Sequence, residues 1–311
     1  MSKPKVRIGF APGQFPDSPQ GHDTVRQLAH LGDEVGYDSV WFSDRVVGGR
    51  FPLEPIVALS MTAAYSPKLK FGASVLALPL RNPVLLAKEL ATLDYLSKGR
   101  LLPAVGLGQD DPAEYQACGV SKEGRAERTD EAITVMRRLW QEDSVTHHGR
   151  FFSFDDVSIV PKPFQKPAPP IWIGGRSKAA QKRTGRLGDG WLVSQATPQE
   201  IEQGCRVIFA AAGEHGRAVD EGHIGTMLGF CIAADDAQAA LIAQPYLGRP
   251  RDDMPFQHYT ALGPPRQISS LINDYIAAGA TKFVARPLCP ADQAMSQLRL
   301  FGQEILPLFH R

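Results

Sequence analysis

The chain has 311 residues, of which 43% are hydrophobic and 22% are charged, and its formal net charge is +1 at pH 7. A chain of this length can bury one large core, and α/β barrels reach this size as a single domain. The near-zero net charge gives no electrostatic reason to expect nucleic acid or an anionic membrane as a partner.

The cysteines and the N-terminal segment bear on the cellular compartment. Cys118, Cys205, Cys231 and Cys289 form no C-x-x-C pair, and their spacing matches neither a zinc site nor a small disulfide scaffold. The sequence shows no signal-peptide core, and no apolar run approaches the roughly 18 residues of a membrane span. These features predict a cytoplasmic protein with reduced thiols.

Short apolar runs alternate along the chain with longer segments of helical periodicity. The runs predict strands at residues 6–11, 39–43, 70–78, 101–108, 170–174, 190–194, 225–233 and 282–286. The segments between them predict helices at residues 22–35, 54–65, 83–96, 124–140, 177–187, 198–215, 266–278 and 291–309. Such alternation favours a parallel sheet with helical crossovers. Eight repeats favour closure into a (β/α)8 TIM barrel that takes in residues 1–311 as one domain.

Two insertions interrupt the alternation, one after the fourth strand and one after the seventh. Residues 143–169 contain an alternating stretch with Gly149 near its centre, which predicts a small hairpin followed by a proline-rich leader. Residues 243–265 are rich in proline, glycine and charge. This second insertion is either a mobile lid over the barrel mouth or a long surface loop.

The third predicted strand contains Gly72 and Ala73, followed by a polar Ser74 among apolar neighbours. Glycine inside a strand often marks a bulge or the close approach of a ligand or another backbone. A buried hydroxyl without a partner costs roughly 1–3 kcal/mol, so Ser74 needs an acceptor or a ligand. The alternative is a barrel layer that requires small side chains.

Functional side chains of a (β/α)8 barrel gather at the carboxyl ends of its strands. The second strand delivers Asp44 and Arg45 to this end. The Asp44 carboxylate would accept a hydrogen bond from a ligand, or it would form a structural Asp–Arg ion pair. The fourth strand ends in Gly106-x-Gly108, which is similar to a dinucleotide fingerprint but lacks its third glycine.

The turn after the fifth strand, Gly174-Gly-Arg-Ser177, has the clearest chemistry. Gly174 and Gly175 allow the backbone to approach a ligand, and Arg176 supplies positive charge. Ser177 opens a helix whose N-terminus favours an anion, and Ser194 would add a hydroxyl from the next strand. The pattern indicates a phosphate cradle, or an ordinary turn in which Ser177 caps the helix.

Two other chemistries are disfavoured. His147 and His148 are adjacent on a predicted strand and point to opposite faces, so a shared metal ion is not expected. The sequence contains no G-x-S-x-G elbow of the kind that carries a nucleophilic serine.

Together these motifs resemble the luciferase-like flavin monooxygenase superfamily of (β/α)8 barrels, and within it the branch that uses the deazaflavin coenzyme F420. The resemblance covers most of residues 6–195 in order, and residues 263–283 more loosely. The matching segments are Gly36-Tyr-Asp-Ser-Val-Trp-Phe-Ser-Asp44, Gly72-Ala-Ser-Val-Leu-Ala77, Leu93-Asp-Tyr-Leu-Ser-Lys-Gly-Arg-Leu101, Gly106-Leu-Gly108, Arg128-Thr-Asp-Glu131, Gly149-Arg-Phe-Phe152, Pro170-Ile-Trp-Ile-Gly-Gly175 and Arg186-Leu-Gly-Asp-Gly-Trp-Leu192.

The resemblance implies a non-prolyl cis peptide between Ser74 and Val75, in a bulge that supports the cofactor ring from behind. Asp44 would face the polar centre of the ring, and the loops at residues 174–175 and 194–195 would hold the cofactor phosphate. The residues implied to bind the cofactor are Asp44, Ser74, Val75, Gly108, Gly174, Gly175, Arg176, Ser177, Ser194 and Gln195. The implied catalytic pair is Asp44 and Arg45.

The chain departs from the sugar-phosphate dehydrogenases of the F420 branch at two positions. Those enzymes carry histidine where this chain has Arg45, and glutamate where it has Asp111. Oxidation of glucose 6-phosphate is therefore not expected. An arginine at the mouth better suits an anionic or carbonyl-bearing small molecule.

The function that the resemblance implies is hydride transfer between coenzyme F420 and a small organic substrate. One alternative is a monooxygenase that uses reduced FMN and O2. Another is a non-catalytic barrel that binds flavin or serves as a structural partner, since a fold alone does not certify activity. A homodimer is the default expectation for the assembly.

Overall fold

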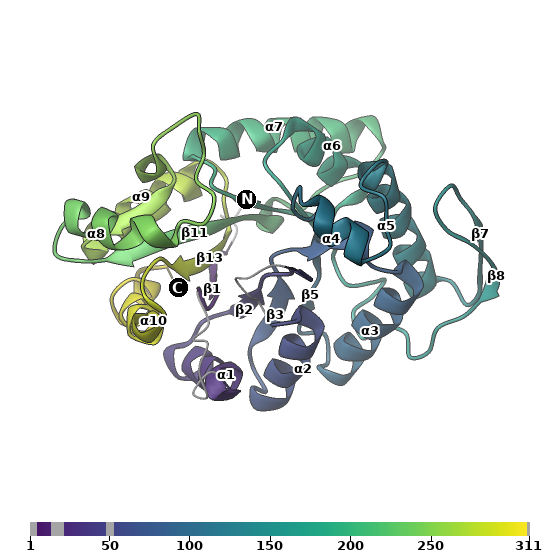
Figure 1. Cartoon of the computed structure of the whole chain (residues 1–311), viewed down its shortest axis with the longest axis horizontal. Helices are drawn as coiled ribbons and strands as arrows, with labels where there is room; N and C mark the ends of the chain where they lie inside the picture. The colour runs from purple at the N-terminus through teal and green to yellow at the C-terminus, as the bar shows by residue number, and fades with distance from the viewer. Residues whose placement is uncertain (1–4, 14–21, 48–52, 310–311) are drawn as a thin grey trace.

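A closed ring of parallel strands forms the centre of the molecule (Figure 1). The computed structural model describes residues 5–13, 22–47 and 53–309. The pairing order is β4-β6-β9-β10-β11-β13-β1-β2-β3-β5, and β3–β4 and β5–β6 are each two halves of one strand, so the ring has eight strands. They are β1 (Arg7–Phe10), β2 (Ser39–Phe42), β3 (Lys70–Ala73), β4 (Leu76–Ala77), β5 (Leu101–Leu102), β6 (Ala104–Gly106), β9 (Trp172–Gly174), β10 (Gly190–Ser194), β11 (Ile224–Ile232) and β13 (Lys282–Pro287). The predicted barrel is confirmed.

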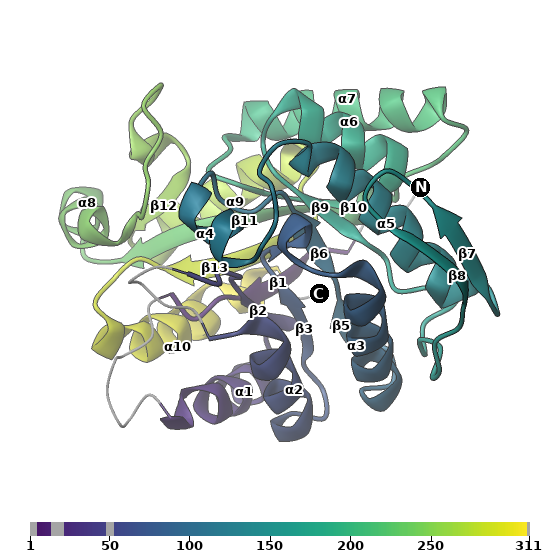
Figure 2. The same cartoon turned by 45° about the vertical axis from the view of Figure 1, so that its right-hand side comes forward.

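Helices surround the ring in both views (Figures 1 and 2). Those that the periodicity predicts are α1 (Thr24–Val35), α2 (Pro55–Tyr65), α3 (Pro83–Leu96), α5 (Arg125–Gln141), α6 (Lys178–Leu187), α7 (Pro198–Glu214), α9 (Pro265–Ala277) and α10 (Ala294–Glu304). Two shorter helices, α4 (Pro112–Ala117) and α8 (Asp236–Ala243), were not predicted. No helix of the described part is long and apolar enough to cross a membrane.

The third and fourth strands of the ring are each broken in the middle. The third breaks at Ser74–Val75, whose peptide bond is cis, as the resemblance implies. The fourth breaks at Pro103, which has no N–H to give to a strand ladder. These two breaks lie side by side, because β3 pairs with β5 and β4 pairs with β6.

A polar cluster fills the amino-terminal end of the barrel. The side chain of Lys282 is 2% exposed, pairs with Asp38 and donates to Ser39 Oγ at 2.7 Å. Its ammonium lies 5.8 Å from the ring centroid of Trp41, which meets Trp172 edge-on at 6.5 Å. This end is therefore closed by side chains, and access to the interior comes from the carboxyl ends of the strands.

The two insertions differ in how they join the barrel. After α5, the antiparallel pair β7 (Val145–His148) and β8 (Ser153–Val157) lies at the edge of the molecule (Figures 1 and 2). After β11, the chain forms α8, then short helical turns at Gln244–Tyr246 and Phe256–His258. It then adds strand β12 (Thr260–Gly263), which pairs with the end of β11. Residues 243–265 are therefore partly built into the sheet.

Candidate functional site

A cavity of about 510 Å³ opens at the carboxyl ends of the strands. It is lined by Ala11, Pro12, Gly13, Phe42, Ser43, Asp44, Arg45, Gln109, Ser194, Gln195, Met227, Tyr246, Leu247, Gly248, Arg249 and Arg286. These residues come from several strands and from the insertion after β11. Of the predicted site residues, the cavity brings together Asp44, Arg45, Ser194 and Gln195.

Asp44 lies in this wall with its carboxylate held on both oxygens. The side chain is 1% exposed and forms an ion pair with Arg81, whose Nη2 lies 3.0 Å from Oδ1 and whose Nε lies 3.1 Å from Oδ2. The backbone N–H of Ala77 donates to Oδ2 at 2.9 Å. The structural Asp–Arg pair is therefore present, and its arginine comes from the turn after the third strand.

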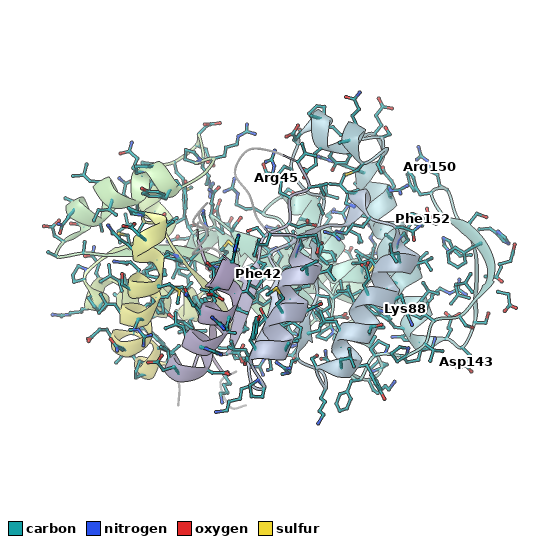
Figure 3. All side chains as sticks on the ribbon, turned by 60° about the horizontal axis from the view of Figure 1, so that its bottom comes forward. Phe42, Arg45, Lys88, Asp143, Arg150 and Phe152 are labelled. Atoms are coloured by element: carbon teal, nitrogen blue, oxygen red, sulfur yellow. The ribbon has the colours of Figure 1, made fainter. Side chains whose placement is uncertain are left out.

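Arg45 lies at the rim of the cavity, above Phe42 in the view of Figure 3. Its Nη2 lies 2.5 Å from Asp111 Oδ2, and its Nε donates to the carbonyl of Val47 at 2.7 Å. The next residue, Val46, donates its N–H to Glu114 Oε1 at 2.6 Å. Two carboxylates of the segment that follows β6, those of Asp111 and Glu114, thus fix the loop that carries Arg45.

The bulge in the third strand contains a hydroxyl without a protein partner. Ser74 Oγ is buried and makes no hydrogen bond within the described structure. The side chain of Val75 points between two glycines, since a Cβ on Gly106 would lie 2.6 Å from Val75 Cγ2 and one on Gly174 would lie 2.7 Å from Val75 Cγ1. The side of Gly174 on which a Cβ would lie is thus occupied by Val75.

The turn after β9 has features both of a phosphate cradle and of an ordinary turn in which Ser177 caps the helix. Gly175 has a φ of 120°, which a side chain would strain, and it is exposed. Ser177 Oγ accepts from the N–H of Ala180 at 3.2 Å, so Ser177 is the N-cap of α6. The N–H groups of the first turn of a helix have no acceptor within the helix and are available to an anion.

Gln195 joins this turn to the insertion after β11. It has a φ of 55°, and its carbonyl accepts from Arg176 Nη1 at 2.9 Å and from Arg251 Nη1 at 2.8 Å. Its own Nε2 donates to the carbonyl of Arg249 at 3.0 Å. The Gly174–Ser177 turn does not line the cavity itself, but Arg176 connects it to a residue that does.

Gly108 lies away from the cavity wall. Its φ is 72°, and a Cβ there would lie 2.9 Å from Ala77 Cβ. The adjacent carbonyl, of Leu107, accepts from the hydroxyl of Tyr115 at 2.6 Å. The turn that leads into α4 is therefore enough to explain why this position is a glycine.

Arg251, which the sequence analysis did not single out, anchors the insertion. Its side chain is 4% exposed and forms a two-pronged ion pair with Glu200, at 2.7 and 2.8 Å, and a second pair with Asp253. Burial raises the pKa of Glu200, but the hydrogen bonds from Arg251 and from the N–H of Thr197, together with the charges of Arg251 and Arg176, outweigh burial, so the net shift of the pKa is downward. The sequence does not reveal the pair with Glu200, because Glu200 lies on α7 and Arg251 in the insertion.

No group of His, Cys, Asp and Glu side chains in the described ranges is arranged to hold a metal ion. The hairpin histidines have other partners. His147 Nε2 lies 3.1 Å from Glu131 Oε1, and His148 Nδ1 lies 3.0 Å from Ser153 Oγ.

Comparison with known proteins identifies the barrel. The family model of luciferase-like monooxygenases matches residues 7–288. The chain is 25% identical to an F420-dependent glucose-6-phosphate dehydrogenase of Kineococcus radiotolerans, over 96% of this chain and 94% of that protein. It is 30% identical to an FMNH2-dependent dimethylsulfone monooxygenase of Pseudomonas putida, over 70% of this chain and 60% of that protein.

The fold of a solved structure matches that of this chain over nearly its whole length. The monooxygenase RslO1 from Streptomyces bottropensis superposes with a TM-score of 0.83 at 22% sequence identity, covering 98% of this chain and all of that one (100%). Relatives with F420 and relatives with FMN are thus both represented. The chain belongs to the luciferase-like monooxygenase family of flavin- and F420-dependent enzymes.

Proposed function

We propose that the protein is an oxidoreductase that transfers hydride between coenzyme F420 and a small organic substrate held in the cavity at the strand ends. The observation that carries the proposal is the adjacency of this cavity to the Gly174–Ser177 turn through Gln195 and Arg176. The cavity has room for the reacting groups, and the turn offers N–H donors and positive charge to the anionic tail of a cofactor.

The residues present fit such a cofactor. The exposed Gly175 and the start of α6 leave room and donors for a phosphate, and Arg176 adds a cation beside them. The unpartnered Ser74 hydroxyl lies in the bulge that would support the ring. When bound, the deazaflavin supplies a hydride donor or acceptor at its central ring carbon.

The chain's own residues would orient the reactants and exclude water. Arg81 and Ala77 fix the Asp44 carboxylate at the cavity wall, so that it presents one orientation to a bound molecule. The segment from Tyr246 to Arg249 covers the opposite wall and is tied to Gln195. Fixed polar groups and a covered cavity are what the protein contributes to a cofactor reaction.

A substitution at Ser177 tests the predicted phosphate position. Ser177→Asp keeps an efficient N-cap but places a negative charge in the turn. We expect the variant to keep its melting temperature and to bind F420 at least tenfold more weakly, measured by fluorescence titration. Ser177→Asn, which caps without charge, is the matched control and should bind within about threefold of the wild type. Equal affinity in all three proteins would place the phosphate elsewhere.

The same titration with FMN tests the second candidate, an FMNH2-dependent monooxygenase. The Pseudomonas putida relative favours this candidate, because its activity is named for reduced FMN. Tighter binding of FMN than of F420 by the wild-type protein would replace the proposed cofactor. Failure of both to bind would support the third possibility, a barrel without this chemistry.

A further inference from the structure

Arg286 lies at the carboxyl end of β13 and lines two neighbouring cavities. One is the cavity described above, and the other, of about 130 Å³, lies under residues Leu247 and Tyr259 of the insertion. Side chains alternate along a strand, so Arg286 faces the barrel interior like Lys282 four residues earlier. The two cations of β13 thus lie at opposite ends of the interior.

The two cations differ in their partners. Lys282 has a carboxylate, Asp38. Arg286 makes one hydrogen bond, from Nη2 to the carbonyl of Tyr246 at 3.3 Å, and no ion pair with any described residue. A guanidinium has five N–H donors, so most of those of Arg286 have no acceptor among the described residues. Burial lowers the pKa of Arg286, as expected for a cation without a compensating anion.

The carboxylates nearest to the cavity are already engaged. Asp44 accepts from Arg81 and Ala77. Among the described residues around the mouth, Asp111 pairs with Arg45, and Glu200 and Asp253 pair with Arg251. Glu114 accepts from the backbone N–H of Val46. Arg249 lines the same cavity from the rim, is exposed, and adds further positive charge.

We propose that Arg286 binds an anionic group of the substrate, a carboxylate, sulfonate or phosphate, at the inner end of the cavity. This inference rests on the proposed function, because it assigns this cavity to the substrate and the Gly174–Ser177 turn to the cofactor. The planar fork of arginine matches two oxygens of such a group. Met227 and Leu247 line the cavity beside Arg286, so the body of the substrate that follows the anion is apolar or neutral.

The charge selectivity of the cofactor-free protein tests the assignment. We would titrate it calorimetrically with benzoate and with benzamide, which have the same shape and differ in charge, and with inorganic phosphate. Wild-type protein should bind benzoate at least tenfold more tightly than benzamide, and Arg286→Met should abolish this preference. Arg206→Met is the matched control, since it removes an exposed arginine on α7 that does not line either cavity, and it should change benzoate affinity less than threefold.

Thermal unfolding gives a second readout that needs no ligand. Removing a buried charge that has no partner relieves its desolvation, so Arg286→Met should melt at a higher temperature than the wild type. Arg286→Lys keeps the charge without the fork, and should retain part of the benzoate preference. A lower melting temperature for Arg286→Met, or binding of neither benzoate nor phosphate to the wild type, would overturn the assignment.

Cofactor titrations separate this inference from the proposed function. If Arg286 serves the substrate, Arg286→Met should bind F420 and FMN within about threefold of the wild type. A tenfold loss of cofactor affinity in Arg286→Met would assign the arginine to the cofactor phosphate instead and refute the proposal. If neither cofactor binds the wild type while the benzoate preference holds, the proposed function fails and the anion site stands.

Discussion

Val75 is the residue around which the middle of the barrel is packed. Its methyl groups fill the space that Gly106 and Gly174 leave open on the two neighbouring strands, and both glycines lie too close to Val75 to accept a Cβ. Val75, from the third strand, therefore restricts positions 106 and 174 to glycine. The close spacing of the backbones around Val75 follows from close packing, which leaves no room for an added methyl group.

Gly174→Ala tests this packing. The new methyl group would lie 2.7 Å from Val75 Cγ1, so we expect the free energy of unfolding to fall by about 1–3 kcal/mol. In the Val75→Ala background the same change should cost less, because the clashing methyl groups are gone. Urea denaturation of the four proteins measures the coupling, and strictly additive effects would contradict the proposed contact.

Asp38, at the closed end of the barrel, makes the free energy of unfolding depend on pH in the acidic range. Burial raises its pKa, but the charges of Lys282, Lys70 and Arg7, together with the hydrogen bond from Lys282, outweigh burial and lower the pKa from 3.8 to about 2. A depressed folded-state pKa contributes stability above the unfolded value, and that contribution of about 2 kcal/mol is lost as the pH falls from about 4 toward 2. Asp38→Asn should remove this part of the pH dependence, as followed by thermal unfolding between pH 2 and 6.

At this scale the sequence predicts some roles and not others. Asp44 and Arg45 could be placed at the mouth because strand ends gather there. The same rule brings Arg81 and Asp111 to the mouth, but their ion pairs with Asp44 and Arg45 are visible only in the structure. Arg286 was recognisable as a strand-end residue, but its lack of an ion pair is visible only once the surrounding carboxylates are placed.

Among the elements, helices with strong apolar periodicity were predicted within a few residues of their ends. The unpredicted ones had readable starts: Asp111 caps α4 ahead of Pro112, and Asp235 caps α8. Their short length hid the periodicity. Strand β12 was missed for another reason, because it depends on β11 continuing beyond the ring to offer it a free edge.

Arg251 should control the order of the insertion after β11. Replacing it by alanine leaves Glu200 without its partner and removes a donor to the carbonyl of Gln195. We expect faster hydrogen–deuterium exchange across residues 246–259 by at least tenfold, measured by mass spectrometry. Arg206→Ala is the control, since Arg206 forms an exposed pair with Glu202 on the same helix as Glu200. Equal exchange in the two variants would show that Arg251 does not anchor the segment.

Several of the exposed apolar side chains of the molecule lie on the neighbouring helices α2 and α3. Val57 on α2 is 60% exposed, and Leu85 and Leu96 on α3 are 60% and 72% exposed. Between these helices is a groove of about 500 Å³ that also carries Lys88 and Glu89 (Lys88 is labelled in Figure 3). A surface with both charges can pair with itself about a two-fold axis, so we expect a second copy of the chain to cover it.

Light scattering tests this expectation of a homodimer. Leu96→Glu together with Val57→Glu places charges in the groove region and should convert a dimer into a monomer of unchanged fold. Leu241→Glu is the matched control, because Leu241 on α8 is 74% exposed and far from this groove in the chain. A wild-type mass equal to one chain would disprove the dimer.

The loop after β2 is bound to the segment after β6, because Asp111 pairs with Arg45 and Glu114 accepts from the N–H of Val46. These two stretches form the two sides of one rim, and neither has its shape without the other. Recombining the protein with a relative would therefore fail if residues 44–47 were exchanged alone. If residues 44–47 and 110–118 are exchanged together, we expect the chimaera to fold with the rim of the relative. Its substrate preference should then change with the rim.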